Sequence, residues 1–366
     1  MRDEHTALDK AYCRAHYGHM SQLCGVRRSF LMDGRARMLE ALDFDNGSGL
    51  NFTVLPGRGM DIAWTKFKGV PISFMTKAGV ASPESYDARG MEWLWNFFGG
   101  MLTTCGMSNA GDPCEDEQPE LGRVQYGLHG RLNNTAASQV SCDAAWEGER
   151  YRLWAKGQVR EGILHGQNLS LTRTISTELG TNSITVHDTV ENEGFFPREL
   201  MLFYHINIGH PILGPGCRLY LPRGTKTVTS ASAVPCEPDL CGTFTEPEPG
   251  APQHVFLHSF PTRERAQAAL YQPRLHMGVA LQFDPRQLPY FSQWKRMASG
   301  DYVVAFEPAN CLAVGRQKMK ELGIEILEPG QRKEVEWTLT VLDSDEALAQ
   351  FVQQADAMQK GVEEAT

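Results

Sequence analysis

The sequence lacks the features that mark membrane-spanning and nucleic-acid-binding proteins. No segment approaches the roughly 20 consecutive apolar residues that a bilayer-spanning helix needs. Lys and Arg form no basic runs, and the formal net charge is -9, which disfavours nucleic acid and anionic membranes as partners. The first residues are polar and carry no apolar stretch of the signal-peptide kind. We therefore predict a cytoplasmic protein with no nucleic-acid or membrane partner.

Cysteine pairs with the spacing of metal or redox sites are also missing. The nine cysteines are scattered, and none belongs to a CxxC pair, so we expect neither structural zinc nor disulfides. The Gly-rich residues 99–106 lack the lysine and the spacing of a phosphate-binding loop. Cys105 lies in this segment, but no base stands beside it in the sequence to activate it as a nucleophile.

Short β-branched and aromatic segments, separated by Gly, Pro, Asn and Asp, fill most of the 366 residues. Several alternate with period two, as half-buried antiparallel strands do. The pattern predicts a large all-β antiparallel sandwich in one domain, 1–366, with an N-terminal extension over about 1–25. Strands are expected at residues 50–55, 61–64, 70–74, 151–155, 168–175, 183–190, 200–208, 277–283, 302–307 and 335–341.

Two loops and one helix complete the prediction. Residues 108–124 and 243–253 are rich in Pro and acidic side chains and are predicted to be long loops. A helix is expected over about 344–360, with Asp343 and Glu346 forming a capping box. The apolar face of this helix would consist of Leu348, Phe351, Val352, Ala355 and Met358.

The first candidate for chemistry is Glu307, a carboxylate at the end of the apolar run 302–306. Burying an ionised carboxylate is costly unless a partner compensates it, and a general base needs a perturbed pKa. Pro308 follows, which predicts that the strand leaves its ladder there and that Glu307 lies near a sheet rim. The alternative is a structural ion pair with Arg131 or Arg316.

Two histidines are embedded in apolar segments in the same way. On a strand over residues 200–208, His205 and Asn207 would share one face and form a pocket wall. His129 is flanked by glycines at 127 and 130, which let a ligand approach closely; the alternative is a structural histidine at a turn. Together with Glu307, these histidines predict an acid/base site that needs no cofactor and no metal.

Trp294 suits a sugar, because the CH face of a sugar stacks on an aromatic ring while its hydroxyls take directed hydrogen bonds. The alternative is a core tryptophan with charged neighbours on the surface. Arg58 and Asp61 are candidates for binding a ligand or for pairing with each other at a turn. The full set predicted to bind substrate is Arg58, Asp61, Arg131, Asn207, Gln293, Trp294, Lys295 and Asn310.

These segments, taken in order, resemble the aldose 1-epimerase (galactose mutarotase) superfamily. The match is to its branch with a Leu-Pro-x-Arg-Gly-Met-Asp-Ile segment, here residues 55–62. The resemblance spans roughly residues 25–342. The other segments that carry it are 99–106, 126–131, 204–209, 293–295, 307–310 and 327–331.

The resemblance implies a β-supersandwich in which a wide concave sheet holds a carbohydrate. It also implies an isomerase that opens and recloses the sugar ring at the anomeric carbon. Glu307 would remove the proton from the anomeric hydroxyl, and His205 would protonate the ring oxygen. His129 would bind the sugar or act as an auxiliary acid.

The sequence departs from the family pattern in three places. Leu128 stands where the family has Asn before the histidine, and residues 100–105 occupy the region of a family arginine. No counterpart of the sugar-binding aspartate is identified between 211 and 290. Two alternatives therefore stay open: a non-catalytic carbohydrate-binding protein, and a metal-dependent sugar isomerase or lyase with His129, His205 and Glu307 as ligands.

Overall fold

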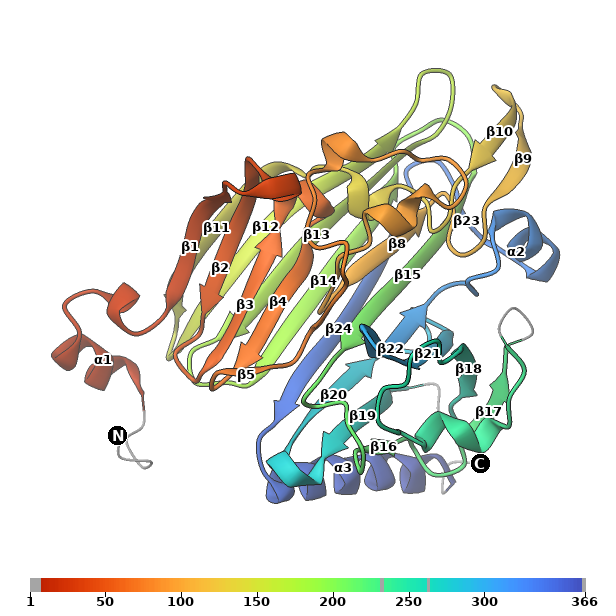
Figure 1. The fold of residues 1–366 in the computed structure, drawn as a ribbon. Helices are drawn as coiled ribbons and strands as arrows, with labels where there is room; N and C mark the ends of the chain where they lie inside the picture. The colour runs from red at the N-terminus through yellow and green to blue at the C-terminus, as the bar shows by residue number, and fades with distance from the viewer. Residues whose placement is uncertain (1–7, 231–233, 262–263, 364–366) are drawn as a thin grey trace.

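Antiparallel strands make up most of the fold, as the sequence predicted (Figure 1). The computed structural model describes residues 8–230, 234–261 and 264–363, with side chains described as far as residue 354. Three larger sheets and two sheets of two strands each account for the strands. The helices are α1 (Lys10–His16), α2 (Arg316–Leu322) and α3 (Asp345–Glu363).

An eight-stranded sheet forms the broad layer that spans the molecule (Figure 1). Its longest strands alternate buried and half-exposed residues, because one face packs on the core while the other meets solvent. In spatial order its strands are β11 (Ser138–Glu147), β12 (Arg150–Gly162), β13 (Asn168–Glu178), β14 (Ser183–Asn192), β24 (Arg332–Leu342), β20 (Met277–Phe283), β19 (Ala266–Gln272) and β16 (Arg218–Tyr220).

A five-stranded sheet covers the part of this layer made by β11 to β14 (Figure 1). Its strands follow chain order: β1 (Gly25–Leu31), β2 (Leu39–Asp45), β3 (Leu50–Leu55), β4 (Asp61–Phe67) and β5 (Val70–Pro71). The first two strands were not among those predicted from the sequence. The strand β1 is mostly exposed, so burial imposes little hydrophobic pattern on it.

A seven-stranded sheet is the third layer and carries the candidate site. Its central strand β15 is buried along nearly its whole length, because it packs on both faces. Leu202, Tyr204 and Ile206 join the main core, while Met201 and Phe203 join a second cluster on the opposite face. The strands are β17 (Lys226–Thr229), β18 (Gln253–Ser259), β21 (Tyr290–Ala298), β22 (Asp301–Ala309), β15 (Arg198–Ile208) and β23 (Glu325–Leu327), with β8 (Thr103–Met107) also paired to β15.

Two predictions about local structure were wrong. Residues 108–124 contain part of a hairpin of β9 (Cys114–Gln118) and β10 (Gly122–Tyr126) instead of an open loop. The acidic side chain of Asp116 on β9 is bound by Arg316 and Lys320 of α2, some 200 residues away in sequence. Because the basic partners of this hairpin are distant in the sequence, the acidic composition of the segment by itself predicted a loop. The other two-stranded sheet pairs β6 (Phe74–Met75) with β7 (Gly99–Gly100).

The second wrong prediction concerns the start of α3. The hydroxyl of Ser344 accepts the backbone N–H of Ala347, so Ser344 caps the helix, while Asp343 pairs with Lys68. The helix itself packs as expected, with Phe351 buried and Leu348 and Val352 beside it. Ala355 and Met358 lie outside the described side chains.

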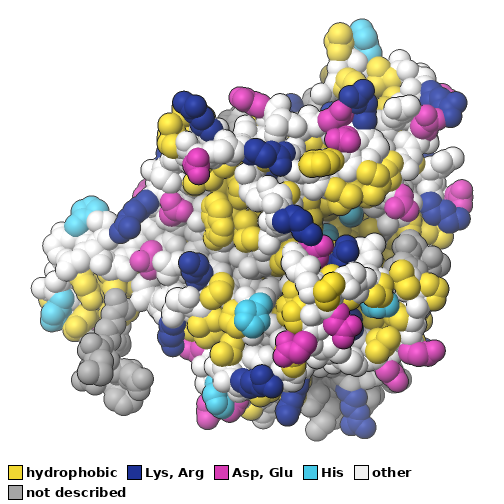
Figure 2. Space-filling view, in the orientation of Figure 1, with side chains coloured by type: hydrophobic (Ala, Val, Ile, Leu, Met, Phe, Trp, Pro, Cys, Tyr) yellow, Lys and Arg dark blue, Asp and Glu magenta, His cyan; other side chains and the backbone are white. Residues whose placement is uncertain are grey.

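Charges and thiols on the described residues agree with the composition. All nine cysteines are free thiols, as predicted. On the face shown in Figure 2, basic and acidic side chains are interspersed, with no continuous patch of one sign. None of the described helices is both long enough and apolar enough to cross a bilayer.

Candidate active site

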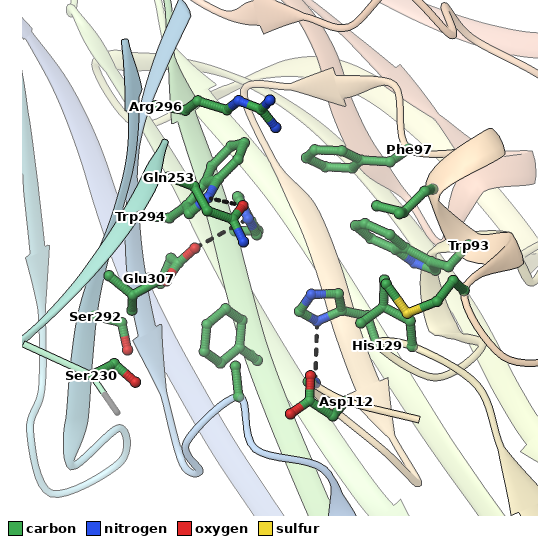
Figure 3. Close-up of a pocket in the computed structure, with 18 of the residues that line it drawn as sticks. Trp93, Phe97, Asp112, His129, Ser230, Gln253, Ser292, Trp294, Arg296 and Glu307 are labelled. Carbon is green, nitrogen blue, oxygen red and sulfur yellow. Dashed lines mark hydrogen bonds and ion pairs between the residues drawn. The ribbon is translucent and has the colours of Figure 1, made fainter. Parts of the chain in front are cut away.

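A pocket of about 580 Å³ lies against the seven-stranded sheet, on the face opposite the main core. Strands β15, β18, β21 and β22 form its floor, and the wall includes residues of 74–78, 91–97, 111–112, 128–129 and 312–314. Figure 3 shows Glu307 and Trp294 on the sheet side, and His129, Trp93 and Phe97 on the facing side. The pocket therefore joins segments from most of the chain's length.

His205 and Glu307 meet directly on the floor of this pocket. The paired positions of β15 and β22 run from Phe203–Ala309 to Ile206–Phe306, and this register places His205 opposite Glu307. The Nε2 atom of His205 lies 3.1 Å from Oε1 of Glu307, and both side chains are at least nine-tenths buried. The acid and the base predicted from the sequence are thus a cross-strand pair.

The structure corrects the predicted position of Glu307 at a sheet rim. Strand β22 lies between β21 and β15 and continues through Pro308 to Ala309. Pro308 lies between the paired positions Phe203–Ala309 and Ile206–Phe306, in the same interval as the His205–Glu307 contact. The N–H that the proline lacks therefore does not end the strand. Neither alternative ion pair forms, because Arg316 binds Asp116 and Glu199, and Arg131 is exposed.

Burial favours the uncharged form of each group in the pair. It raises the pKa of Glu307 well above the ordinary value of a glutamate. It lowers the pKa of His205 to about 3, with nearby His129 lowering it further and the Asn207 side chain opposing the shift. Both shifts favour the neutral forms of the pair, a carboxylic acid and an imidazole, whereas the family resemblance implies Glu307 as the base and His205 as the acid.

His129 faces this pair from the opposite wall. Its ring centroid lies 6.3 Å from that of His205 and 4.6 Å from that of Trp93. The backbone N–H of Gly111 donates to Nδ1 of His129 at 3.3 Å, which leaves the hydrogen of the neutral ring on Nε2. Burial lowers the pKa of His129 to about 4, so the ring is a neutral hydrogen-bond donor at neutral pH.

A glycine is required beside His129. Gly111 has φ +85°, and a Cβ there would lie 2.1 Å from the backbone carbon of Ala313. Only glycine allows the two loops to approach this closely and hold the ring of His129 in the pocket wall.

Aromatic rings frame the space above the pair. The ring of His205 lies 5.3 Å from both Phe97 and Trp294, measured between centroids. The indole N–H of Trp294 donates to Oε1 of Gln253 at 3.1 Å, which fixes the plane of the indole. An apolar slot with polar groups at its base is the arrangement that a sugar ring requires.

Strand alternation separates the predicted residues of β21 into two groups. Trp294 lines the pocket, while Gln293 and Lys295 point to the other face of the sheet. Gln293 bonds to His258 and to the carbonyl of Cys241. Lys295 bonds to the carbonyls of Leu240 and Thr243.

Arg58 and Asp61 also lie outside the pocket lining, in the buried scaffold. Arg58 donates to the carbonyls of Asn133, Ala81 and Asn96, and so ties three loops together. Asp61 accepts from Thr104 and pairs with the fully buried Arg173 at 2.9 Å. These bonds use the charged groups of both residues within the protein.

Asn310 and Asn207 have internal partners as well. Asn310 binds the backbone of β15 at Leu202 and Leu200. The Asn207 amide nitrogen donates to the carbonyls of His205 and Gly99. Its oxygen Oδ1 and the Nδ1 atom of His205 are both buried and have no hydrogen-bond partner among the described residues. Asn207 therefore sits behind the catalytic candidate, not in front of it.

Four polar residues on the pocket floor were not predicted from the sequence: Ser292, Gln253, Arg296 and Asp301. The available signal was the period of two on β21, since Ser292 and Arg296 are each two residues from Trp294. Cys105 is fully buried, and burial raises its pKa well above that of a free thiol, so it is not poised as a nucleophile. No group of three or more His, Cys, Asp or Glu able to hold a metal is found in the described chain.

The fold and the position of the pocket define the class: the protein has the galactose mutarotase-like β-sandwich fold. The chain belongs to the family described as "Domain of unknown function (DUF4432)", whose model matches residues 36–341. No curated protein matches the sequence.

Solved structures support the fold assignment. A protein from Klebsiella pneumoniae, described provisionally as an aldose 1-epimerase, superposes with a TM-score of 0.80 at 24% identity, over 90% of this chain and 86% of that one. A galactose mutarotase-like protein from Clostridium acetobutylicum gives 0.58 at 12% identity, covering 88% and 99%. Galactose 1-epimerase from Lactobacillus acidophilus gives 0.56 at 12% identity, with the same coverages. At these identities the likeness concerns the fold alone.

Proposed function

We propose that this protein is a sugar 1-epimerase that opens and recloses the ring of a carbohydrate at its anomeric carbon. The observation that carries the proposal is the buried His205–Glu307 pair, 3.1 Å apart, beside the indole of Trp294 in a pocket large enough for a sugar. The fold shared with mutarotase-like proteins supports the same reaction class. The substrate is a small carbohydrate, and the chemistry requires only proton transfers.

The reaction moves one proton onto the ring oxygen and one off the anomeric hydroxyl, and the pair can exchange both. In the neutral form that burial favours, the acid of Glu307 gives its proton while the imidazole of His205 accepts one. The products are then a carboxylate and an imidazolium, with no net change in charge. On reclosure the carboxylate takes a proton from the ring-forming hydroxyl and the imidazolium gives one to the carbonyl oxygen. Each group thus acts on the oxygen opposite to the one that the family resemblance assigns to it in ring opening.

The neutral and ionic forms of the pair hold the same number of protons. The pair can therefore begin ring opening in one of these forms and ring closure in the other, as microscopic reversibility requires. His129, with its hydrogen on Nε2, would donate a hydrogen bond to a sugar oxygen from the opposite wall.

The test is NMR exchange spectroscopy or polarimetry on freshly dissolved sugars, over a panel of aldoses, ketoses and sugar acids. We expect Glu307→Gln and His205→Asn each to reduce turnover by about 10²- to 10⁴-fold, the usual contribution of a positioned acid or base, while sugar binding persists. His276→Asn is the matched control, because His276 is two-thirds exposed and pairs with Asp345 beside α3.

Binding without acceleration in the parent protein would instead show a carbohydrate-binding protein on the same scaffold. Equal exchange rates for the parent and both pocket variants would remove Glu307 and His205 from the mechanism. Turnover that is lost with a chelator and restored by a divalent metal would favour the metal-dependent alternative.

A further inference from the structure

Arg296 is the one arginine among the residues that line the pocket, in the chain as far as the structure describes it. It lies on β21, on the same face as Trp294, and its side chain is 35% exposed. Figure 3 shows it at the end of the pocket beyond Trp294, directed toward the side on which Phe97 lies. The proposed sugar-ring opening uses no group at this end.

The guanidinium of Arg296 is incompletely paired. Its Nε is buried and has no hydrogen-bond partner among the residues described. Among the described residues its one ion pair is with Asp301, and the Nη2–Oδ2 distance is 3.8 Å, beyond hydrogen-bond length. An arginine presents five donors in a rigid fork, so this end of the pocket offers donors that the protein itself leaves unused.

The charge balance at this end is positive. The same oxygen of Asp301 lies 3.1 Å from Nζ of Lys77, which also lines the pocket. One carboxylate thus serves two cations. The other acidic side chains of the lining are Asp112, which Figure 3 places at the opposite end, and Glu307, whose pKa burial raises.

The strand register relates this end to the reacting pair. Ser292 is paired with Glu307, and Arg296 is paired with Val303, four residues further along β21. Four residues of strand span about 13 Å, more than the width of the indole that separates them. A sugar stacked on Trp294, with its anomeric carbon at Glu307, would point a substituent of a distant carbon toward Arg296.

We propose that the Arg296–Lys77 end of the pocket binds an anionic substituent of the sugar, so that the substrate is a sugar acid or a sugar phosphate and not a neutral hexose. The planar fork of Arg296 matches the two oxygens of a carboxylate or phosphate, and Lys77 adds a second charge. This inference rests on the proposed function for the position of the anomeric carbon.

The experiment compares neutral sugars with their anionic counterparts on the full chain: glucose with glucuronate and glucose 6-phosphate, and galactose with galacturonate. Anomer exchange is followed by NMR, and binding is measured separately by calorimetry. We expect kcat/KM for one anionic class to exceed that for its neutral parent by at least about tenfold, because charge-assisted hydrogen bonds exceed neutral ones by that order. The class with the raised kcat/KM, sugar acids or the sugar phosphate, shows whether the site binds a carboxylate or a phosphate.

Arg296→Met keeps the length of the side chain and removes its charge and donors. It should abolish the anionic preference by raising KM for the anionic sugar more than for its neutral parent, whereas Arg296→Lys should restore part of the preference. The matched control is Arg332→Met, because Arg332 is exposed on β24 and pairs with Glu191 away from the pocket. Added salt should weaken the preference in the parent protein.

Equal kcat/KM for neutral and anionic sugars, or an anionic preference that survives in Arg296→Met, would overturn the inference and leave the epimerase proposal intact. If no sugar is turned over, calorimetry decides: tighter binding of glucuronate or glucose 6-phosphate that is lost in Arg296→Met supports the anion site even though the epimerase proposal fails. Absence of any anionic preference in both measurements rejects the site.

Discussion

At the scale of single residues, the central feature is a carboxyl group and an imidazole that are buried together, where burial favours the uncharged form of each. A surface pair of the same residues would be carboxylate and imidazolium at some pH values, and solvent would screen it. Here burial shifts both pKa values toward the neutral forms. The resulting pair can give and take a proton without creating net charge in a buried site, which suits the proposed reaction at a hemiacetal.

Asn207 is expected to set which nitrogen of His205 carries the hydrogen. Its oxygen is the nearby acceptor on the same strand face, and a hydrogen on Nδ1 directed there leaves Nε2 to accept the proton of Glu307. We predict that Asn207→Ala reduces kcat by at least about tenfold with little change in KM. Ring ¹⁵N chemical shifts of His205 should report a mixture of tautomers in this variant and one tautomer in the parent.

Asn207→Asp provides a second readout that a purely structural role would not alter. A carboxylate beside His205 raises the pKa of the imidazole, so the acidic limb of the rate–pH profile should move to higher pH. The parent should keep its rate down to the pKa of about 3 for His205 and about 4 for His129. An unchanged acidic limb in Asn207→Asp would show that Asn207 does not act on His205.

At the scale of secondary-structure elements, alternation along β21 decides which side chains reach the ligand. Ser292, Trp294 and Arg296 line the pocket, whereas Gln293 and Lys295 bind loop carbonyls behind the sheet. Donors that are adjacent in sequence are therefore separated by the full thickness of the sheet. Strand β22 behaves in the same way, since Glu307 faces the pocket and Phe306 joins the core on the other face.

Helix α3 depends on a cap that differs from the one its sequence pattern indicated. Ser344→Ala removes the hydroxyl that accepts the N–H of Ala347 and should lower the free energy of unfolding by about 1 kcal/mol. Chemical denaturation followed by circular dichroism measures this loss. Epimerase activity should not change, because α3 packs on Tyr271 and Leu342 on the side of the molecule away from the pocket.

The comparison variant is Asp343→Ala. Asp343 pairs with Lys68, whose side chain is 59% exposed, and such surface pairs contribute little. A larger loss of stability for Asp343→Ala than for Ser344→Ala would contradict the assignment of the cap.

At the scale of the whole molecule, the site exists only because three parts of the chain converge on one sheet face. The wall comes from residues 91–129, the floor from strands between 198 and 309, and the Gly111–Ala313 contact joins the two sides. Keeping an acid and two histidines uncharged in this interior makes the stability of the protein depend on pH. As pH rises, Glu307 lowers the free energy of unfolding, whereas the histidines raise it.

Glu307→Gln is expected to stabilise the protein above the pKa of an unfolded glutamate. Burial raises the folded-state pKa of Glu307, so its stabilising contribution is complete below about pH 4.5 and is lost as pH rises. The difference in unfolding free energy between variant and parent should grow by up to about 1.4 kcal/mol per pH unit across this range. Urea denaturation at pH 5, 6, 7 and 8 measures it, with exposed Glu328→Gln as the control.

The buried histidines act in the opposite direction in both proteins. The pKa of His129 and of His258 is lowered to about 4 by burial, so the unfolded chain binds more protons below pH 6.5 and stability falls as pH falls. This term is common to the parent and the variant and cancels in the comparison. Parallel pH profiles for the two proteins would mean that Glu307 is ionised in the empty pocket.

Much of the fold was predictable because strands carry their own signature. Period-two burial marked β13, β14 and β24, and the strands at 50–55 and 277–283 were predicted with the observed bounds. Strands β1 and β2 and the acidic hairpin β9–β10 were missed. No residue of β1 is fully buried, and the charge of Asp116 on β9 is compensated by the distant Arg316 and Lys320. In the site, the pairing of His205 with Glu307 agrees with the sequence argument that placed both in one pocket.

The sequence by itself determined the antiparallel β class and the presence of an acid and two histidines in apolar segments, because hydrophobic alternation and isolated polar residues are local properties. Only the tertiary structure decided that Arg58 and Asp61 belong to the scaffold, that Arg296 replaces Lys295 in the pocket, and that the pKa of Glu307 is raised. Those outcomes depend on strand register and on the depth of burial. Both arise from contacts between residues that are far apart in the chain.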